Sequence, residues 1–412
     1  MLLAVAAAVT VLYRLGTPHG FFDLKIYMAA MRWWAAGNPL YDYVQPDLLQ
    51  GELYFTYPPF AALLLRPFAG LPLGVTIVIF TALTVAAVAV TTWWLVAPLA
   101  RRRGWPVWFP VAVAAGLALG VESTREMIGF GQINMLLVVL ILADLLIAVP
   151  RGSRWAGVGV GLATAIKLFP GIFIIYLLVT RRWRTAAVAS ATAAGATLLA
   201  AAVAPRDSWR FWTQELWETN RVGRPDYTAN QSLFGLLSRL TVPEKPTTLI
   251  WLLLVVAVAG YGLWRAARAA RAGDELAGLT LTGLVGALVS PITWTHHVYW
   301  FIPALVVLVD AGLRPPAGSP EWPGARRRAA LLALAAAGYV AITYGVVSYY
   351  DWGIAPEPTA TPAEFLLRNL YVLFALVLLV VPPIRRGAPP PAAAVSPAAG
   401  SGRRRRGPAG TG

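Results

Sequence analysis

Long apolar runs separated by clusters of arginine constrain the fold of this chain more than any other feature of its sequence. The runs are roughly 16–25 residues long, and a helix needs about 20 predominantly apolar residues to cross a bilayer. Only 13% of the 412 residues are charged, whereas a soluble domain carries about 25%. Because this charge is too sparse to coat a soluble surface, the sequence predicts a polytopic integral membrane protein.

The excess of basic residues indicates how the chain is oriented in a membrane. The formal net charge is +15, which by itself would also suit a nucleic-acid-binding protein. The arginines lie beside the apolar runs rather than on one basic face, so the positive-inside rule explains them better, and we expect no nucleic-acid partner. The chain has no cysteine, which excludes disulfides, thiolate metal sites and cysteine nucleophiles.

Arginine clusters are expected to face the cytoplasm. They comprise Arg101 to Arg103, Arg151 with Arg154, Arg181 and Arg182 with Arg184, Arg265 with Arg268 and Arg271, Arg314 to Arg328, and Arg385 and Arg386 with Arg403 to Arg406. Four stretches rich in Trp, Tyr, Pro and Asp then fall on the outer side, at residues 17–58, 121–133, 205–247 and 348–363. Tryptophan and tyrosine concentrate at membrane–water interfaces, which agrees with this placement.

The alternation of apolar runs and basic clusters predicts an all-α fold with about ten full spans and one re-entrant helix pair. The first span, Met1 to Gly16, is expected to be an uncleaved anchor rather than a signal peptide. Basic clusters flank both ends of residues 155–180, and Lys167 and Pro170 lie in the middle. This segment is therefore expected to enter the membrane and return as two short helices around an internal cavity.

One transmembrane domain is expected over residues 1–384, followed by a disordered, basic cytoplasmic tail over residues 385–412. The first extracytoplasmic loop, residues 17–58, carries the most informative carboxylate, Asp23. Residues 23–36 alternate as an amphipathic helix that would lie on the membrane surface. Spacing alone leaves two interpretations of Asp23 open, the N-cap of that helix and a catalytic carboxylate.

Transfer of a sugar from a lipid-linked sugar phosphate would explain a carboxylate at this place. One carboxylate acting as a general base makes the acceptor hydroxyl more nucleophilic, and the leaving phosphate needs cationic or hydrogen-bonding partners. The candidate partners are Lys25, Arg32, Lys167, His296 and His297. Snorkelling of Lys167 and a merely interfacial position of the histidines are the structural alternatives. No metal-ligand spacing is present, so we expect neither a metal nor another cofactor.

Two further polar clusters lie on the predicted outer side. One runs from Glu122 to Asn134, with Gln132 and Asn134 entering the next span. Polar groups at the outer end of a span bind sugar hydroxyls in some proteins and hydrogen-bond neighbouring helices in others. The other cluster is Asn230-Gln231-Ser232-Leu233 in the long loop 205–247, for which a solvated loop is the alternative. The sequence does not decide between these interpretations.

Taken in order, the motifs resemble those of the polyprenol-phosphate-mannose-dependent α-(1→2)-mannosyltransferases of actinobacteria, glycosyltransferase family 87, which have the GT-C fold. The matching motifs are Asp23-Leu24 with Tyr27, Gly37 to Tyr41, Phe55 to Pro59, Gly131 to Asn134, Lys167 with Pro170, Asn230 to Leu233, and Ser290 to Trp294 with His296 and His297. No single motif is specific, and the ordered set over about residues 20–300 carries the resemblance. The short first span and the C-terminal third depart from it.

The resemblance implies a transmembrane GT-C enzyme of the plasma membrane with its active site on the extracytoplasmic side. It implies that Asp23 is the catalytic base, that a β-linked mannosyl phosphate donor gives an α-(1→2) mannoside by inversion, and that the acceptor is a phosphatidylinositol mannoside or a lipomannan-type glycolipid. The donor phosphate is expected to contact His296, His297, Lys167 and Lys25. The sugar and acceptor are expected to contact Tyr27, Tyr57, Gln132, Asn134, Asn230 and Gln231.

Two other functions remain possible for such a sequence. A flippase or transporter of lipid-linked sugars would also use a cavity and intramembrane charge, although the repeat halves common in transporters are not visible here. A transferase for another lipid-phosphate sugar, such as arabinose, would share every motif named above. Transfer of label from a donor lipid to an acceptor separates the first of these from a mannosyltransferase, and a comparison of donors separates the second.

Overall fold

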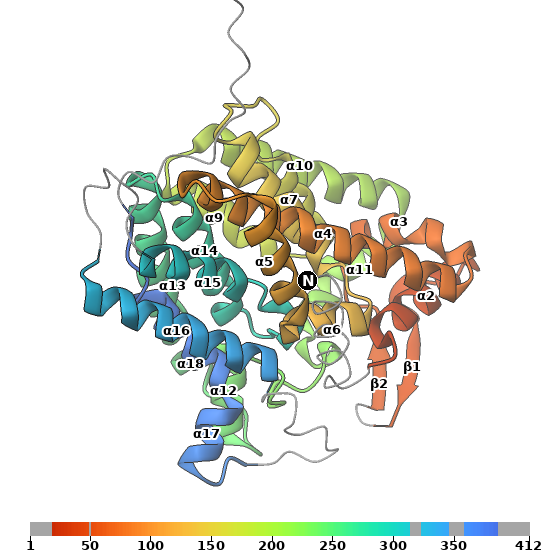
Figure 1. The fold of residues 1–412 in the computed structure, drawn as a ribbon. Helices are drawn as coiled ribbons and strands as arrows, with labels where there is room; N and C mark the ends of the chain where they lie inside the picture. The colour runs from red at the N-terminus through yellow and green to blue at the C-terminus, as the bar shows by residue number, and fades with distance from the viewer. Residues whose placement is uncertain (1–18, 49–50, 314–322, 346–357, 386–412) are drawn as a thin grey trace, which may run out of the picture.

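The computed structural model describes residues 19–48, 51–313, 323–345 and 358–385. The predicted first span, residues 348–357 of the fourth outer stretch and the tail from residue 386 lie outside the described residues. Helices dominate the described part of the chain, and its one sheet is a two-stranded antiparallel hairpin (Figure 1). The expected all-α class is therefore confirmed except for this hairpin.

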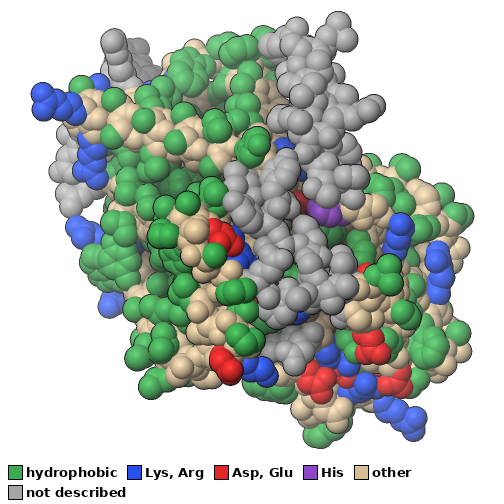
Figure 2. Space-filling model, turned by 90° about the horizontal axis from the view of Figure 1, so that it is seen from below, with side chains coloured by type: hydrophobic (Ala, Val, Ile, Leu, Met, Phe, Trp, Pro, Cys, Tyr) green, Lys and Arg blue, Asp and Glu red, His purple; other side chains and the backbone are tan. Residues whose placement is uncertain are grey.

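Three of the described helices have the length and apolarity to cross a membrane. They are α4 (Leu73–Arg102), α10 (Trp183–Val203) and α13 (Thr248–Arg271), and only 28%, 22% and 17% of their most apolar stretches is buried within the protein. Apolar surface on this scale is costly in water and is typical of helices that face lipid. Figure 2 shows one face of the molecule on which hydrophobic side chains are widespread.

A fourth candidate span is bent, because α17 (Pro362–Arg368) and α18 (Leu370–Val380) meet at 72°. The shorter apolar helices are α5 (Trp108–Gly120), α7 (Asn134–Ala143) with its continuation η3 (Asp144–Ala148), α9 (Ile172–Val179), α14 (Glu275–Val289) and α15 (Phe301–Gly312). The 20-residue helix α16 (Ala325–Tyr344) packs beside α15. The number of about ten full spans stays a prediction.

The segment 155–180 is interrupted, as its lysine and proline predict. Helix α8 (Val158–Ile166) ends at Lys167, whose backbone is extended, and the short helix η4 (Phe169–Gly171) leads into α9. Pro170 at the start of η4 cannot donate a backbone hydrogen bond, which disfavours a continuous helix. The break leaves Lys167 between two helices, within the fold.

The first outer loop packs on the protein rather than on a bilayer. Its described part comprises α2 (Phe22–Ala35), η1 (Leu40–Asp42), β1 (Val44–Asp47) and β2 (Gly51–Tyr54), and it is followed by α3 (Pro59–Leu65) and η2 (Arg66–Gly70). Helix α2 and the hairpin lie at one side of the molecule in Figure 1. The apolar face of α2, including Leu24, Met28 and Met31, is buried in a cluster with residues of α3 and α4. The expectation that this face contacts lipid is therefore wrong, because neighbouring helices cover it.

Several further described segments are predicted to lie on the outer side. They are α6 (Glu122–Phe130), α11 (Pro205–Thr213), η5 (Glu215–Trp217), η6 (Thr219–Val222), α12 (Leu233–Thr241) and η7 (Thr295–His297). Asp207 of α11 accepts hydrogen bonds from Trp34 Nε1 at 3.0 Å and from the Leu40 backbone N–H at 2.9 Å. These bonds hold α11 against α2 and η1, so segments 167 residues apart share one surface.

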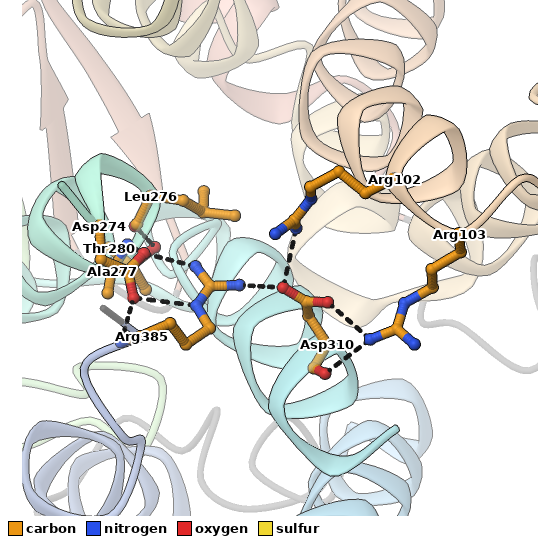
Figure 3. Close-up of polar contacts among 8 residues, drawn as sticks. All are labelled: Arg102, Arg103, Asp274, Leu276, Ala277, Thr280, Asp310 and Arg385. Atoms are coloured by element: carbon orange, nitrogen blue, oxygen red, sulfur yellow. Dashed lines mark hydrogen bonds and ion pairs between the residues drawn. The ribbon is translucent and has the colours of Figure 1, made fainter. Parts of the chain in front are cut away.

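An ion cluster joins several of the predicted cytoplasmic helix ends (Figure 3). Asp310 of α15 accepts from Arg102 Nη2 and Arg103 Nη2 at the end of α4, each at 2.9 Å, and also from Arg385. Arg385 in turn donates from Nε to Asp274, the N-cap of α14, at 2.9 Å. The side chains of Asp274 and Asp310 are 1% exposed and that of Arg385 is 5% exposed. Arg385, which the sequence analysis assigned to the tail, therefore lies within the fold.

Substitution of Asp310 with asparagine should destabilise the protein, because three buried or partly buried arginines would lose their shared carboxylate. Removal of one partner from a buried ion pair costs about 3–5 kcal/mol. The unfolding midpoint of the purified protein in detergent would measure the loss. Glu244→Gln is the matched control, since Glu244 is exposed, and equal midpoints for the two variants would contradict a stabilising role.

Candidate active site

A cavity of about 330 Å³ lies among the segments that are predicted to lie outside. Its wall includes Asp23 of α2, Tyr57 in the loop before α3, Gln132 after α6, Lys167 between α8 and α9, and His297 of η7. Segments spread between Phe22 and His297 therefore contribute to one site. The cavity also has a large apolar lining, with Phe22, Phe55, Phe130, Phe169 and Phe211 among its residues.

Backbone geometry places Asp23 on the cavity wall. The N-cap of α2 is Phe21, which makes no side-chain capping bond, so the N-cap interpretation of Asp23 is wrong. Phe21 has a φ of 58°, a left-handed conformation that is uncommon for a non-glycine residue. Its N–H donates to the Gly129 carbonyl at 2.7 Å. This bond fixes the start of α2 against α6 and directs the next turn toward the cavity.

Gly131 allows α2 and the α6–α7 connection to approach closely. It has a φ of 71°, and a Cβ at this position would lie 2.5 Å from Leu24 Cβ. Any larger residue would push α2 away. The close approach lets Gln132 Nε2 donate a hydrogen bond to Asp23 Oδ2.

A hydrogen-bond network continues from Gln132 into the cavity. Tyr57 donates to Gln132 Oε1 at 2.9 Å, and Tyr27 donates to the Tyr57 hydroxyl at 2.8 Å. Gln132 Nε2 also donates to the Tyr27 hydroxyl at 3.1 Å. These bonds fix the orientation of the Gln132 amide, so that its N–H group, and not its carbonyl, faces Asp23.

Lys167 lies at the junction of three elements. Its Nζ donates to Asn134 Oδ1 at 3.1 Å and to the Tyr57 hydroxyl at 3.3 Å, and lies 2.9 Å from His297 Nε2. The other His297 ring nitrogen, Nδ1, accepts from the Trp294 backbone N–H at 3.1 Å. Lys167 is thus held inside the fold, and the alternative that it extends to the cytoplasmic interface is wrong.

The electrostatic environment suits a proton acceptor. Burial raises the pKa of the Asp23 carboxyl from 3.8 to about 6, while the Gln132 hydrogen bond and the charges of Lys167 and His19 act in the opposite direction. Burial and the Lys167 charge lower the pKa of His296 and of His297 well below 6.5. Near neutral pH the site therefore holds an ionised Asp23 beside uncharged imidazole rings.

His296 is the cavity residue whose polar atoms most clearly lack a protein partner. It is 4% exposed and contacts the rings of Phe130 and His297, with centroids 5.2 Å and 4.5 Å away. Neither ring nitrogen has a hydrogen-bond partner among the described residues. A buried polar group in this state is costly unless a ligand or water satisfies it.

Several predicted site residues do not line the cavity. Lys25 is exposed on α2, and Arg32 donates to the carbonyls of Ala69 and Leu71 at 3.2 and 3.1 Å. Asn134 is buried, and it contacts Lys167 and the His296 carbonyl rather than the cavity. The contacts of Arg32 and Asn134 therefore hold neighbouring segments of the protein in position.

Asn230 and Gln231 are buried and also lie outside the cavity wall. Asn230 Oδ1 accepts from the Thr293 N–H at 2.9 Å, and Gln231 Nε2 donates to the Arg368 carbonyl at 2.8 Å. The Asn230 amide holds the loop at residues 290–297 in place, as does the Gln231 backbone N–H, which donates to the Thr293 carbonyl at 2.6 Å. The Gln231 side chain instead fixes the junction of α17 and α18. We therefore assign Asn230 and Gln231 a structural role and not the predicted sugar-binding role, because both side chains already hydrogen-bond to protein groups.

Sequence reasoning missed a carboxylate near the site. Glu126 of α6 is 4% exposed, accepts a hydrogen bond from Thr295 Oγ1 and lies 3.8 Å from His19 Nε2. Its place within the polar stretch from Glu122 to Asn134 was a signal, because a carboxylate on a buried helix needs a partner. Among the described residues no three His, Asp or Glu side chains cluster as metal ligands, and the absence of a metal stays a prediction.

Comparison with known proteins identifies the family. Residues 55–291 match glycosyltransferase family 87. The chain belongs to this family. The matched region contains Tyr57, Gln132 and Lys167, while Asp23 and His297 lie outside it.

Curated relatives of this family 87 member cover most of its length. It is 34% identical to the polyprenol-phosphate-mannose-dependent alpha-(1-2)-phosphatidylinositol mannoside mannosyltransferase of Mycobacterium tuberculosis, over 77% of this chain and 74% of that protein. The protein of the same description from Mycolicibacterium smegmatis is 36% identical over 69% of each chain. An alpha-(1->3)-arabinofuranosyltransferase of M. tuberculosis is 30% identical over 73% of this chain and 69% of that protein.

A solved structure, ArnT from Cupriavidus metallidurans bound to undecaprenyl phosphate, is similar over 92% of this chain and 76% of that chain. The sequence identity is 18% and the TM-score is 0.36. A score this low does not establish a common fold, so the GT-C fold stays a prediction. Family membership does establish that this chain is an enzyme of the glycosyltransferase class.

The pKa of Asp23 predicts the pH dependence of this glycosyltransferase. A general base must be ionised, so kcat/KM should rise with pH through a step near pH 6. Gln132→Met removes a bond that lowers this pKa, so the step should move to higher pH. A pH–rate profile of each protein checks this, and a wild-type profile that is flat between pH 5 and 7 would exclude Asp23 as the base.

Proposed function

We propose that this chain transfers mannose from polyprenyl-phosphate mannose to a mannose-bearing glycolipid of the phosphatidylinositol mannoside or lipomannan type, forming an α-(1→2) linkage. The observation that carries the proposal is the ionisable Asp23 carboxylate beside Lys167 and His297 in one cavity. The names of relatives at 34% and 36% identity support mannose as the sugar and a polyprenol phosphate as its carrier.

In this mechanism Asp23 takes the proton of an acceptor hydroxyl while the hydroxyl oxygen attacks the anomeric carbon of the donor. The bond between that carbon and the phosphate oxygen breaks, and its electron pair leaves with the prenyl phosphate. A single displacement inverts the configuration, so a β-linked donor gives an α-mannoside. One carboxylate is sufficient, because a phosphate leaves without the acid that glycoside hydrolysis requires.

Lys167, His296 and His297 would bind the departing phosphate. Charge-assisted hydrogen bonds from an ammonium group stabilise the negative charge that grows on the leaving oxygen. His296 lines the cavity, and its ring nitrogens lack a partner within the described part of the chain, so a phosphate oxygen would satisfy one of them. Tyr27, Tyr57 and Gln132 would orient Asp23 and contact the sugar, since all three line the same wall.

The distribution of charge supports a site on the extracytoplasmic side of the plasma membrane. Arg102, Arg103 and Arg385 meet in one ion cluster, and positive clusters face the cytoplasm. The cavity is built mainly from the segments predicted to lie outside. A donor entering from the outer leaflet would keep its prenyl chain in lipid, next to the apolar surfaces of α4, α10 and α13.

A pentose donor is the second candidate. The arabinofuranosyltransferase from M. tuberculosis is 30% identical over 73% of this chain, and the same base and phosphate partners would serve either sugar. Purified protein supplied with polyprenyl-phosphate mannose or polyprenyl-phosphate arabinose, each labelled, distinguishes the two. Label that moves through the membrane without joining an acceptor would instead support a flippase.

Asp23→Asn should abolish transfer while the protein still folds. Loss of a general base costs about 10²–10⁴-fold in rate, and the neutral amide keeps nearly the same shape, so donor affinity should change little. Transfer of labelled mannose to glycolipid in membranes supplied with donor measures the effect. Glu244→Gln is the control, and near-normal product formation by Asp23→Asn would refute the assignment.

A further inference from the structure

The cavity has a second set of polar side chains that the mechanism does not use. Tyr54 of β2 and Glu215, Glu218 and Arg221 of the η5–η6 segment line the same cavity as Asp23. They come from the hairpin and from the long outer loop between α10 and α12. Phe211, Leu216 and Val222 add apolar surface to this part of the wall.

Arg221 is held rigidly in this wall. Its Nε lies 2.7 Å from Glu215 Oε2, and its Nη2 donates to the Tyr41 carbonyl at 3.0 Å. The guanidinium carbon lies 4.0 Å from the centroid of the Tyr54 ring. Because one ion pair, one hydrogen bond and one ring contact fix the guanidinium group, it presents a defined direction to the cavity.

Glu218 lies beside Arg221 without a direct hydrogen bond to it. The separation from Glu218 Oε2 to Arg221 Nη1 is 4.0 Å, and the Glu218 side chain is 60% exposed. A hydrogen bond of this type needs about 2.7–3.2 Å. The carboxylate and the guanidinium therefore offer an acceptor and a donor side by side, which is the arrangement that neighbouring hydroxyls of a sugar ring can bridge.

The charge of this wall disfavours a phosphate. Glu215 and Glu218 outnumber Arg221, and the nearby Arg210 is itself paired with Asp42 and Glu215. A small excess of negative charge repels an anion and accepts hydrogen bonds from neutral hydroxyls. The Tyr54 ring and the apolar side chains suit the C–H face of a pyranose.

We propose that Tyr54, Glu218 and Arg221 form a subsite for a neutral hexose of the acceptor, and that they set acceptor specificity. The inference rests on the proposed function, since it assigns the donor phosphate to the Lys167 region and the acceptor carbohydrate to this wall. Glu218 accepts hydrogen bonds from the hexose, and Arg221 donates to it. Glu215 is a positioning residue that acts through Arg221.

Binding of two separate probes tests the subsite without requiring transfer. The full chain in lipid nanodiscs would be titrated with octyl α-mannobioside, a neutral sugar probe, and with farnesyl phosphate, a prenyl phosphate probe. Glu218→Ala should weaken the mannobioside roughly tenfold, the value of one charge-assisted hydrogen bond, and leave farnesyl phosphate unchanged. Glu218→Gln keeps an acceptor oxygen, so its affinity for the mannobioside should fall less than that of Glu218→Ala. Lys167→Gln should weaken the binding of farnesyl phosphate and leave the binding of the mannobioside unchanged.

Glu244→Ala is the matched control, because Glu244 is an exposed carboxylate of the same outer loop that does not line the cavity. The subsite is overturned if wild-type protein does not bind the mannobioside, if Glu218→Ala binds it normally, or if Glu218→Ala weakens both probes equally. A parallel assay with labelled polyprenyl-phosphate mannose separates the two proposals. The expected binding pattern without any transfer would leave the subsite standing and refute mannosyl transfer.

Discussion

The hydrogen bond from Gln132 to Asp23 is the contact on which the rest of the site depends. It joins two segments 109 residues apart, and it requires the glycine at position 131, because a side chain there would collide with Leu24. The same amide is oriented by Tyr57, which also contacts Lys167. Asp23, the proposed base, and Lys167, the proposed phosphate partner, are therefore linked through one tyrosine and one glutamine.

Burial gives this arrangement its chemistry. Asp23 is far enough from water for its pKa to rise to about 6, yet it lines an open cavity that a hydroxyl can reach. The proximity of Lys167 and the amide of Gln132 keeps the carboxylate ionised near neutral pH. A more exposed aspartate would be a weaker base, and one buried without these partners would stay protonated.

Charge is separated between the two ends of the fold. Asp274, Asp310 and Arg385 form a buried cluster whose charges pair with one another and with Arg102 and Arg103. This cluster therefore stabilises helix ends. The cavity instead has polar groups, such as the His296 ring, that no described residue satisfies. This contrast is what marks the cavity, and not the larger ion cluster, as the place where a ligand binds.

The sequence by itself determined the membrane class, the break at Lys167 and the family, because apolar run length, a proline within a span and ordered motifs are local properties of the chain. It also singled out Asp23, Gln132, Lys167 and His297. Only the tertiary structure decided that Asn230 and Gln231 hold a loop, and that Tyr54, Glu218 and Arg221 line the cavity. The physical reason is that helix packing and loop geometry fix which side chains point inward, and no spacing along the chain encodes contacts between residues so far apart.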